Sequence, residues 1–420
     1  MSQFRFLKSR DDYYKHFTAL DIGSDLVKAL VVRREAPNGM VLGVSREPQH
    51  PDGMAGGTIA DVDLVIDGCN RALEAAEDMA GTVPGQVVLG IAGELVKGFS
   101  SSIAYPRERP GDRVRESELR NMLQLVERRA LREAQHLLEL ERAYGDVGEV
   151  RLVHSAITQV RIDGYPVTNP IGFQGRNLEV TVFNTFAPAT QVAGLETVAR
   201  ELDLEIAGTV SQPYALARAC AGDEAWELGG IFIDVGGGTT DVALLRGGGV
   251  EGTRMFGLGG QAFTRRLAGE LGLTFHEAEA RKLRHSEGLL PPEHEYAVSQ
   301  LLQTDVEVLL QGLALCLREL ARGEVLPYNI YVCGGGSLLP ELMYELSRNI
   351  WAEGLPFEHQ PQARLLTPGD AHSLIDTTGQ LLSAQDVGPL ALANHALRVE
   401  TEERDAVGGV MRGVLKAMKV

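Results

Sequence analysis

Cysteine is scarce in this chain of 420 residues, which has four: Cys69, Cys220, Cys316 and Cys333. None forms a C-x-x-C pair or has histidine-rich neighbours, so neither a disulfide framework nor a zinc site is indicated. The sequence also lacks any uninterrupted apolar run of about 18 residues, and its polar N-terminus lacks the apolar core of a signal peptide. We therefore expect a cytoplasmic protein that does not span a membrane.

Positive charge is in deficit. Lys and Arg number 40 against 57 Asp and Glu, which gives a formal net charge of -17. Most of the surface should repel a polyanion, so a nucleic-acid partner is not expected. A hydrophobic content of 44% is ample for a folded protein, and the length exceeds what one core usually organises. We expect two or more lobes.

The common phosphate-binding motifs are missing as well. No G-x-x-x-x-G-K-[ST] sequence occurs, and the triple glycine 236–238 leads into an apolar strand pattern where a dinucleotide-binding fold needs a helix. The chain is therefore predicted to be neither a P-loop enzyme nor a Rossmann-type dehydrogenase.

What the sequence does contain is a repeated plan. Residues 19–31, ALDIGSDLVKALV, and 233–245, IDVGGGTTDVALL, both run from an apolar strand through Asp-x-Gly to a second apolar strand. The connections are too short for a helix, so each copy predicts an antiparallel hairpin and the pair suggests an internal duplication. A third glycine turn, in IYVCGGGSLLPEL, precedes a helical pattern.

Glycine turns of this kind allow backbone N–H groups to converge on an anion. Two such hairpins could hold the phosphates of a nucleotide from opposite sides, with hydrogen bonds from Thr239 and Thr240. Asp21 and Asp234 could hold Mg²⁺ through its water shell. A single Asp-x-Gly hairpin is more often an ordinary tight turn, but two matching copies and a third turn favour the nucleotide site.

These three motifs resemble those of the actin-like ATPases, which include actin, MreB, DnaK-type chaperones, sugar kinases and FtsA. The resemblance implies an α/β, two-lobed actin-like fold that binds ATP and Mg²⁺. It implies that the residues near the phosphates or metal are Asp21, Gly23, Ser24, Lys28, Asp234, Gly236, Gly237, Gly238, Thr239, Thr240 and Asp241. Gly334, Gly335, Gly336 and Ser337 would cup the adenosine, and Glu279 and Lys282 would lie beside the ribose and adenine. For the last two, a solvated i,i+3 ion pair is the alternative.

The segment 84–187 is similar to the inserted subdomain of FtsA, especially around Pro170, Ile171, Gly172, Gly175, Leu178 and Glu179. Phe173 and Arg266 depart from the FtsA pattern, which puts local contacts in doubt. The implied division has an N-terminal tail 1–15, a first lobe (16–83, 188–215 and 371–398) interrupted by the insert 84–187, and a second lobe 216–370 with a helical subdomain 251–325. An acidic linker 399–405 and a C-terminal helix 406–420 follow.

Gln212 stands where many members of the superfamily carry an acidic residue that positions or activates water. A glutamine can orient water but cannot act as a general base at neutral pH. We expect at most a slow ATPase, with the nucleotide mainly structural. The alternative is that Gln212 satisfies a backbone group at the hinge between the lobes.

The last residues predict a short amphipathic helix. Apolar side chains recur at helical spacing among basic ones, and the predicted membrane-contacting set is Val410, Met411, Val414, Leu415, Met418, Arg412, Lys416 and Lys419. Such a helix would lie in the interface of an anionic membrane, as in FtsA. Docking of the tail on protein is the alternative, and three glycines weaken the isolated helix.

Taken as an FtsA-like protein, the chain would tether FtsZ filaments, through the FtsZ C-terminal peptide, to the inner face of the bacterial cell membrane at the division septum. It would self-associate into filaments and recruit other division proteins. A PilM-like component of type IV pilus assembly is the first alternative, and the C-terminal helix argues against it. A sugar or acetate kinase is the second, for which no acceptor-substrate signature is apparent.

Overall fold

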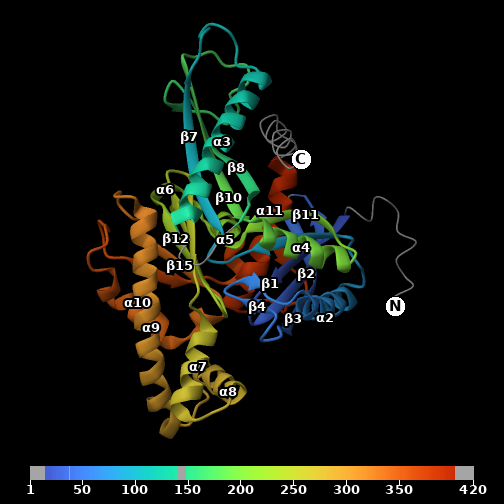
Figure 1. The fold of residues 1–420 in the computed structure, drawn as a ribbon, viewed down its shortest axis with the longest axis vertical. Helices are drawn as coiled ribbons and strands as arrows, with labels where there is room; N and C mark the ends of the chain where they lie inside the picture. Colours follow the sequence, from blue (N-terminus) through green and yellow to red (C-terminus); the bar gives the residue numbers. More distant parts are fainter. Residues whose placement is uncertain (1–14, 37, 141–147, 403–420) are drawn as a thin grey trace.

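The computed structural model describes residues 15–36, 38–140 and 148–402. Within them, two large sheets form the framework of the molecule (Figure 1). The first has the order β11(Glu205–Ser211), β6(Gln86–Ile91), β1(His16–Ile22), β2(Leu26–Glu35), β3(Asn38–Pro48), β17(Leu374–Asp376).

The second sheet has the order β16(Gln362–Leu365), β15(Asn329–Cys333), β12(Gly230–Val235), β13(Thr240–Arg246), β14(Gly249–Phe256), β7(Lys97–Pro106), β10(Asn177–Pro188), β8(Val150–Ile162), β9(Tyr165–Pro166). The predicted hairpins are confirmed, because β1 pairs antiparallel with β2, and β12 with β13.

The two sheets repeat one topology, which supports the predicted duplication. In the first, β1 runs parallel to β6 and β6 parallel to β11, while β2 and β3 follow antiparallel. In the second, β12, β15 and β16 are parallel neighbours, and β13 and β14 follow antiparallel. The order β11-β6-β1-β2-β3 therefore corresponds to β16-β15-β12-β13-β14.

Helices cover both sheets. On the first sheet pack α2(Val62–Ala80), α4(Ala189–Glu201) and α11(Val387–Glu402), and on the second α6(Asp223–Leu228), α7(Gly260–Leu271), α9(Pro292–Ala321) and α10(Pro340–Arg348). α5(Gln212–Cys220) packs on α11 and contacts strands of both sheets, and α8(Phe275–Ser286) packs on α7 and α9. Short 3-10 turns lie at Gly335–Leu338, Ile350–Ala352, Pro368–Asp370 and Ala384–Asp386. In α9 the buried Val298, Leu302 and Val306 recur every four residues, and this stripe packs into the second core.

The α10 face predicted from the sequence is present: Leu339, Leu342 and Leu346 are buried, and Met343 is partly buried against the same core. α2 begins where the Asp61 side chain accepts from the Leu64 amide and ends at Gly81, whose φ of 64° suits glycine. Standard capping and patterning thus explain these helices.

The insert differs from its predicted outline. β6, which falls inside the segment 84–187, lies between β1 and β11 in the first sheet, because its apolar run after Gln86 suits a central position buried on both faces. The remaining strands of the insert extend the second sheet: Phe99 and Gly98 of β7 pair with Gly252 and Thr253 of β14. α3(Glu116–Leu140) packs on β7 and β10 and covers a separate small core.

Candidate functional site

The turns of the two predicted phosphate hairpins are built alike. The Gly23 amide donates to the Leu26 carbonyl at 3.1 Å, and the Gly236 amide donates to the Thr239 carbonyl at 2.9 Å. In each hairpin the glycine after Asp-x therefore closes a turn onto the residue three positions later. Position and hydrogen bond agree between the two copies.

The two turns also touch each other. A Cβ placed on Gly237 would lie 2.6 Å from the Cβ of Asp25, and one on Gly238 would lie 2.6 Å from Ser24 Oγ. Neither glycine has a left-handed φ, so close approach of the other hairpin explains the absence of a side chain at these two positions. The sequence-based expectation that glycine frees backbone amides did not include this contact.

The N-terminus of α7 braces the second turn. The amides of Gly260 and Gln261 donate to the carbonyls of Gly236 and Gly237, at 2.9 and 2.8 Å. Since the C=O and N–H of a trans peptide point in opposite directions, the N–H groups of Gly237 and Gly238 point away from α7. Gln261 Nε2 also donates to the Ser24 carbonyl at 2.9 Å, which ties α7 to the first turn. Such a fixed array of amides suits an anion.

Asp21 lies in a polar cluster at the end of β1. Gln212 Nε2 donates to Asp21 Oδ1 at 2.6 Å, and Lys28 Nζ lies 3.6 Å from Asp21 Oδ2. Lys28 also donates to the Gln385 carbonyl at 2.9 Å. Gln212, the first residue of α5, thus contacts the first-hairpin carboxylate rather than a hinge backbone group. It lies at the site where a water-positioning residue was expected, and its catalytic role stays a prediction.

Asp21 is 8% exposed, and Asp234, at the corresponding place in β12, is of intermediate exposure. Burial raises the pKa of Asp234 to about 6; Lys28 opposes this rise, Asp21 adds to it and a hydrogen bond from Cys333 opposes it. A Cβ on Gly388 of α11 would lie 3.4 Å from Asp234 Oδ2 and 3.6 Å from Asp21 Oδ2, so both oxygens face the same point. Two converging carboxylates fit a hydrated Mg²⁺.

Asp241, the third predicted metal ligand, pairs with Asp234 across the hairpin. Burial raises the pKa of Asp241 well above the usual range, and the negative charges of Asp234 and Asp21 add to this rise. A hydrogen bond from Thr239 opposes it. Its role as a metal ligand stays a prediction. Thr240 is fully buried and its hydroxyl donates to the Leu258 carbonyl at 2.7 Å, so this hydroxyl is already used within the fold.

The third glycine turn lies directly beside Asp234. Gly334 has a φ of 88°, and a Cβ there would lie 2.1 Å from Asp234 Oδ1. A Cβ on Gly336 would meet Val235 Cγ1 at 2.5 Å, whereas Gly335 has open space on its Cβ side. The buried Ser337 hydroxyl donates to the Gly334 carbonyl at 2.6 Å and so holds the turn closed.

Glu279 and Lys282 form the i,i+3 pair expected on α8, at 2.8 Å, but the pair is not solvated. Lys282 is 7% exposed and also donates to the Gly260 carbonyl at 3.0 Å and to Thr264 Oγ1 at 2.8 Å. The pair therefore joins α8 to the N-terminus of α7. The pKa of Asp25 in the first turn is raised, first by desolvation and then by the negative charge of Glu279, and Lys282 and Lys28 oppose this rise. Glu279 and Lys282 therefore lie close enough to the first turn to act on its charge.

Sequence reasoning missed three residues of this site: Asp25, Gln261 and Gly388. Asp25 directly follows the predicted Gly23 and Ser24, so its place in the turn was a usable signal. Gln261 and Gly388 begin helices far from the hairpins in sequence, and only their contacts identify them.

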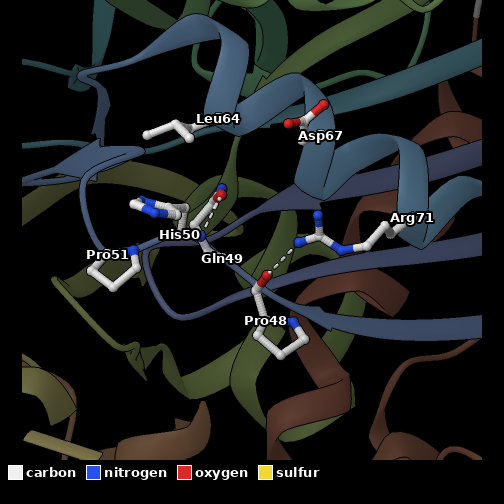
Figure 2. A pocket seen from close by; sticks show the side chains of 7 residues that line it. All are labelled: Pro48, Gln49, His50, Pro51, Leu64, Asp67 and Arg71. Atoms are coloured by element: carbon white, nitrogen blue, oxygen red, sulfur yellow. Dashed lines mark hydrogen bonds between the residues drawn. The ribbon is translucent and has the colours of Figure 1, made fainter.

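Figure 2 shows a pocket of about 280 Å³ between the start of α2 and the chain after β3. Its lining residues are Pro48, Gln49, His50, Pro51, Leu64, Asp67 and Arg71. Arg71 Nη2 donates to the Pro48 carbonyl at 3.0 Å. None of the predicted site residues lines this pocket.

Within residues 15–402, apart from 37 and 141–147, no helix has the length and apolarity needed to cross a bilayer. No group of three or more His, Cys, Asp or Glu side chains is arranged to hold a metal ion there. The predicted membrane-contacting residues, within 406–420, lie outside the described residues.

Comparison with known proteins supports the family resemblance. A family model described as "Cell division protein FtsA" matches residues 231–366. FtsA of Pseudomonas aeruginosa is 25% identical over 401 residues, which cover 90% of this chain and 88% of that protein. FtsA of Agrobacterium fabrum is 30% identical over 287 residues, 65% of this chain and 60% of that protein. The predicted resemblance to FtsA is confirmed.

Among solved structures, the PilM-PilN type IV pilus biogenesis complex matches with a TM-score of 0.62 at 19% identity, over 90% of this chain and 98% of that one. The ethanolamine utilization protein EutJ from Carboxydothermus hydrogenoformans matches with a TM-score of 0.50 at 15% identity, over 90% and 89%. These similarities concern the fold, and they confirm the two-lobed actin-like ATPase architecture.

Proposed function

We propose that this chain, a relative of the FtsA proteins with the actin-like fold, binds MgATP and tethers FtsZ filaments to the cytoplasmic membrane at the division septum. The observation that carries the proposal is the similarity to a cell division FtsA over 401 residues, which cover 90% of this chain and 88% of that protein. No single motif would suffice, because one fold hosts many functions.

The nucleotide would bind where the three glycine turns meet. Asp21 and Asp234 would hold Mg²⁺ through water, and the amides of Gly237 and Gly238 would face the phosphates. Gln212 carries no basic group and already donates to Asp21, so hydrolysis would be slow. ATP would act mainly as a clamp that holds the two lobes together.

Assembly would use parts outside the nucleotide site. The insert would contact a neighbouring protomer in a filament, and the C-terminal helix would bind an anionic membrane. A filament presents many tails at once, so individually weak membrane contacts would add to a strong attachment. FtsZ, through its C-terminal peptide, and other division proteins would bind to the filament.

The decisive test changes the tail in the full-length protein. Replacing Val414 and Leu415 with Glu removes the centre of the apolar stripe, which with its neighbours is worth on the order of 5 kcal/mol before ordering costs. We expect this double variant to remain in the supernatant when sedimented with vesicles of anionic lipid, with MgATP binding unchanged.

The matched control changes only charge. Replacing Arg412 and Lys416 with Gln keeps the apolar stripe and removes roughly 1 kcal/mol for each basic residue. This control should still bind vesicles, with a weaker dependence on salt. Sedimentation of the Glu variant at physiological salt would show that the tail is not the anchor.

A pilus role is the second candidate, since the PilM-PilN complex shares the fold over 98% of its compared chain. Fluorescent fusions in dividing cells separate the two candidates. A mid-cell band that depends on the tail and on FtsZ supports division, whereas foci at pilus bases would favour the pilus role.

A further inference from the structure

A small hairpin has no counterpart in the duplicated topology. In the second half, β14 ends at Phe256 and α7 begins at Gly260. In the first half, residues 49–61 separate β3 from α2, and they contain the two-stranded hairpin β4(Met54–Ala55) and β5(Thr58–Ile59). The extra segment lies at the site described above.

The root of this segment is bonded to the first phosphate hairpin. The Gln49 amide donates to the Asp25 carbonyl at 2.9 Å, so the chain leaves β3 directly beside the first turn. Gln49 is 7% exposed and its Oε1 accepts from the His50 amide at 3.1 Å, as Figure 2 shows. Past the hairpin, the amides of Ala60 and Asp61 both donate to the Gly53 carbonyl, which closes the segment on itself.

The tip of the segment touches the second phosphate hairpin. A Cβ on Gly57 would lie 2.9 Å from Gly93 Cα and 3.3 Å from Thr239 Cγ2. At the start of α4, Gln191 Nε2 donates hydrogen bonds to the Gly57 carbonyl at 3.5 Å and to the Ala92 carbonyl at 2.5 Å. The tip therefore lies close to Thr239 of the second turn, and it is held there by Gly93 and by Gln191 of the first lobe.

The neighbouring glycine makes none of these contacts. Gly56 and Gly57 are the two central residues of the turn, with φ of 56° and 77°, as a type I′ hairpin requires. A Cβ on Gly56 would meet nothing within 4 Å. Both positions disfavour a side chain through their backbone conformation, but of the two only Gly57 is also closed in, by the backbone of Gly93 and by Thr239.

We propose that the β4–β5 hairpin is a latch across the two phosphate turns, and that the close fit of Gly57 against Gly93 and Thr239 slows the release of bound nucleotide. The inference rests on the proposed nucleotide function and deepens it. A segment bonded to one turn and packed on the other resists their separation, and a ligand held between lobes leaves when they separate.

The test compares Gly57→Ala with Gly56→Ala in the full-length protein. Both lose the backbone freedom of glycine, so the comparison isolates the close contacts of Gly57 with Gly93 and Thr239. Each variant is loaded with N-methylanthraniloyl-ATP and Mg²⁺, and release is followed by fluorescence after mixing with excess ATP. We expect about tenfold faster release from Gly57→Ala, and a rate within about twofold of wild type from Gly56→Ala.

Thermal melting of both variants without nucleotide checks the fold, and we expect them to melt within a few degrees of each other. Equal release rates for wild type and Gly57→Ala, or equal acceleration by both variants, would overturn the latch while leaving the proposed function standing. Failure of the wild-type chain to bind the fluorescent nucleotide would overturn both.

Discussion

The first and second phosphate hairpins share a backbone plan and differ in the surroundings of their carboxylates. Each closes its turn with the same hydrogen bond from glycine. Asp21 has Gln212 and Lys28 as close partners, whereas burial raises the pKa of Asp234 to about 6. The duplicated half-folds thus keep one scaffold and hold their carboxylates differently.

The largest expected effect comes from Asp234→Asn. The folded-state pKa of about 6 lies above the ordinary value of 3.8, so the folded chain binds the proton more tightly and loses stability as pH rises from about 4 to 6. Above that range the ionised group costs up to about 3 kcal/mol. The nucleotide-free variant should therefore unfold at higher urea concentration than wild type at pH 7.5.

Urea unfolding at pH 4 and pH 7.5 provides the control, because the advantage of the variant should shrink at the lower pH. The same substitution should abolish binding of MgATP, measured by calorimetry. A variant less stable than wild type at pH 7.5 would refute the contrast between the two hairpins.

The next largest effect separates the two turn glycines. A Cβ on Gly23 would lie 2.6 Å from the Leu26 carbonyl oxygen, but one on Gly236 would lie 3.2 Å from the Thr239 carbonyl oxygen. A methyl group on Gly23 therefore fits only if the backbone of the turn is displaced. A methyl group on Gly236 needs a shift of only a few tenths of an ångström. We expect Gly23→Ala to lower the free energy of unfolding by about 2 kcal/mol and Gly236→Ala by less than about 1 kcal/mol, as measured in urea. A larger loss for Gly236→Ala than for Gly23→Ala would contradict this ranking of the two turns.

The smallest effect is expected from Asp21→Asn. The new side chain can still accept the hydrogen bond from Gln212, and only the attraction to Lys28 at 3.6 Å is lost. We expect a loss of about 1 kcal/mol in the free energy of unfolding without nucleotide. The sign is opposite to that of Asp234→Asn, so the pair of variants tests the comparison directly. Equal signs in the same urea titration would contradict it.

Much of the fold followed from local patterns. The hairpins at 19–31 and 233–245, the third glycine turn and the helix after it all appeared where apolar runs and glycines indicated them. The outline of the insert was less accurate. Composition located its helix, but it could not show that β6 belongs to the first sheet or that β7 pairs with β14. Strand order depends on partners far away in sequence, which a single strand does not specify.

The sequence alone determined the type of chemistry at the site. Asp-x-Gly turns between stiff strands require glycine and carboxylate wherever the chain places them, because backbone sterics and hydration act locally. Only the tertiary structure decided which glycines face the other hairpin, that Asp21 and Asp234 converge beside Gly388, and that Gly57 closes on Thr239. The physical reason is distance along the chain: these contacts join segments brought together by the packing of the two sheets, and their geometry belongs to the folded whole.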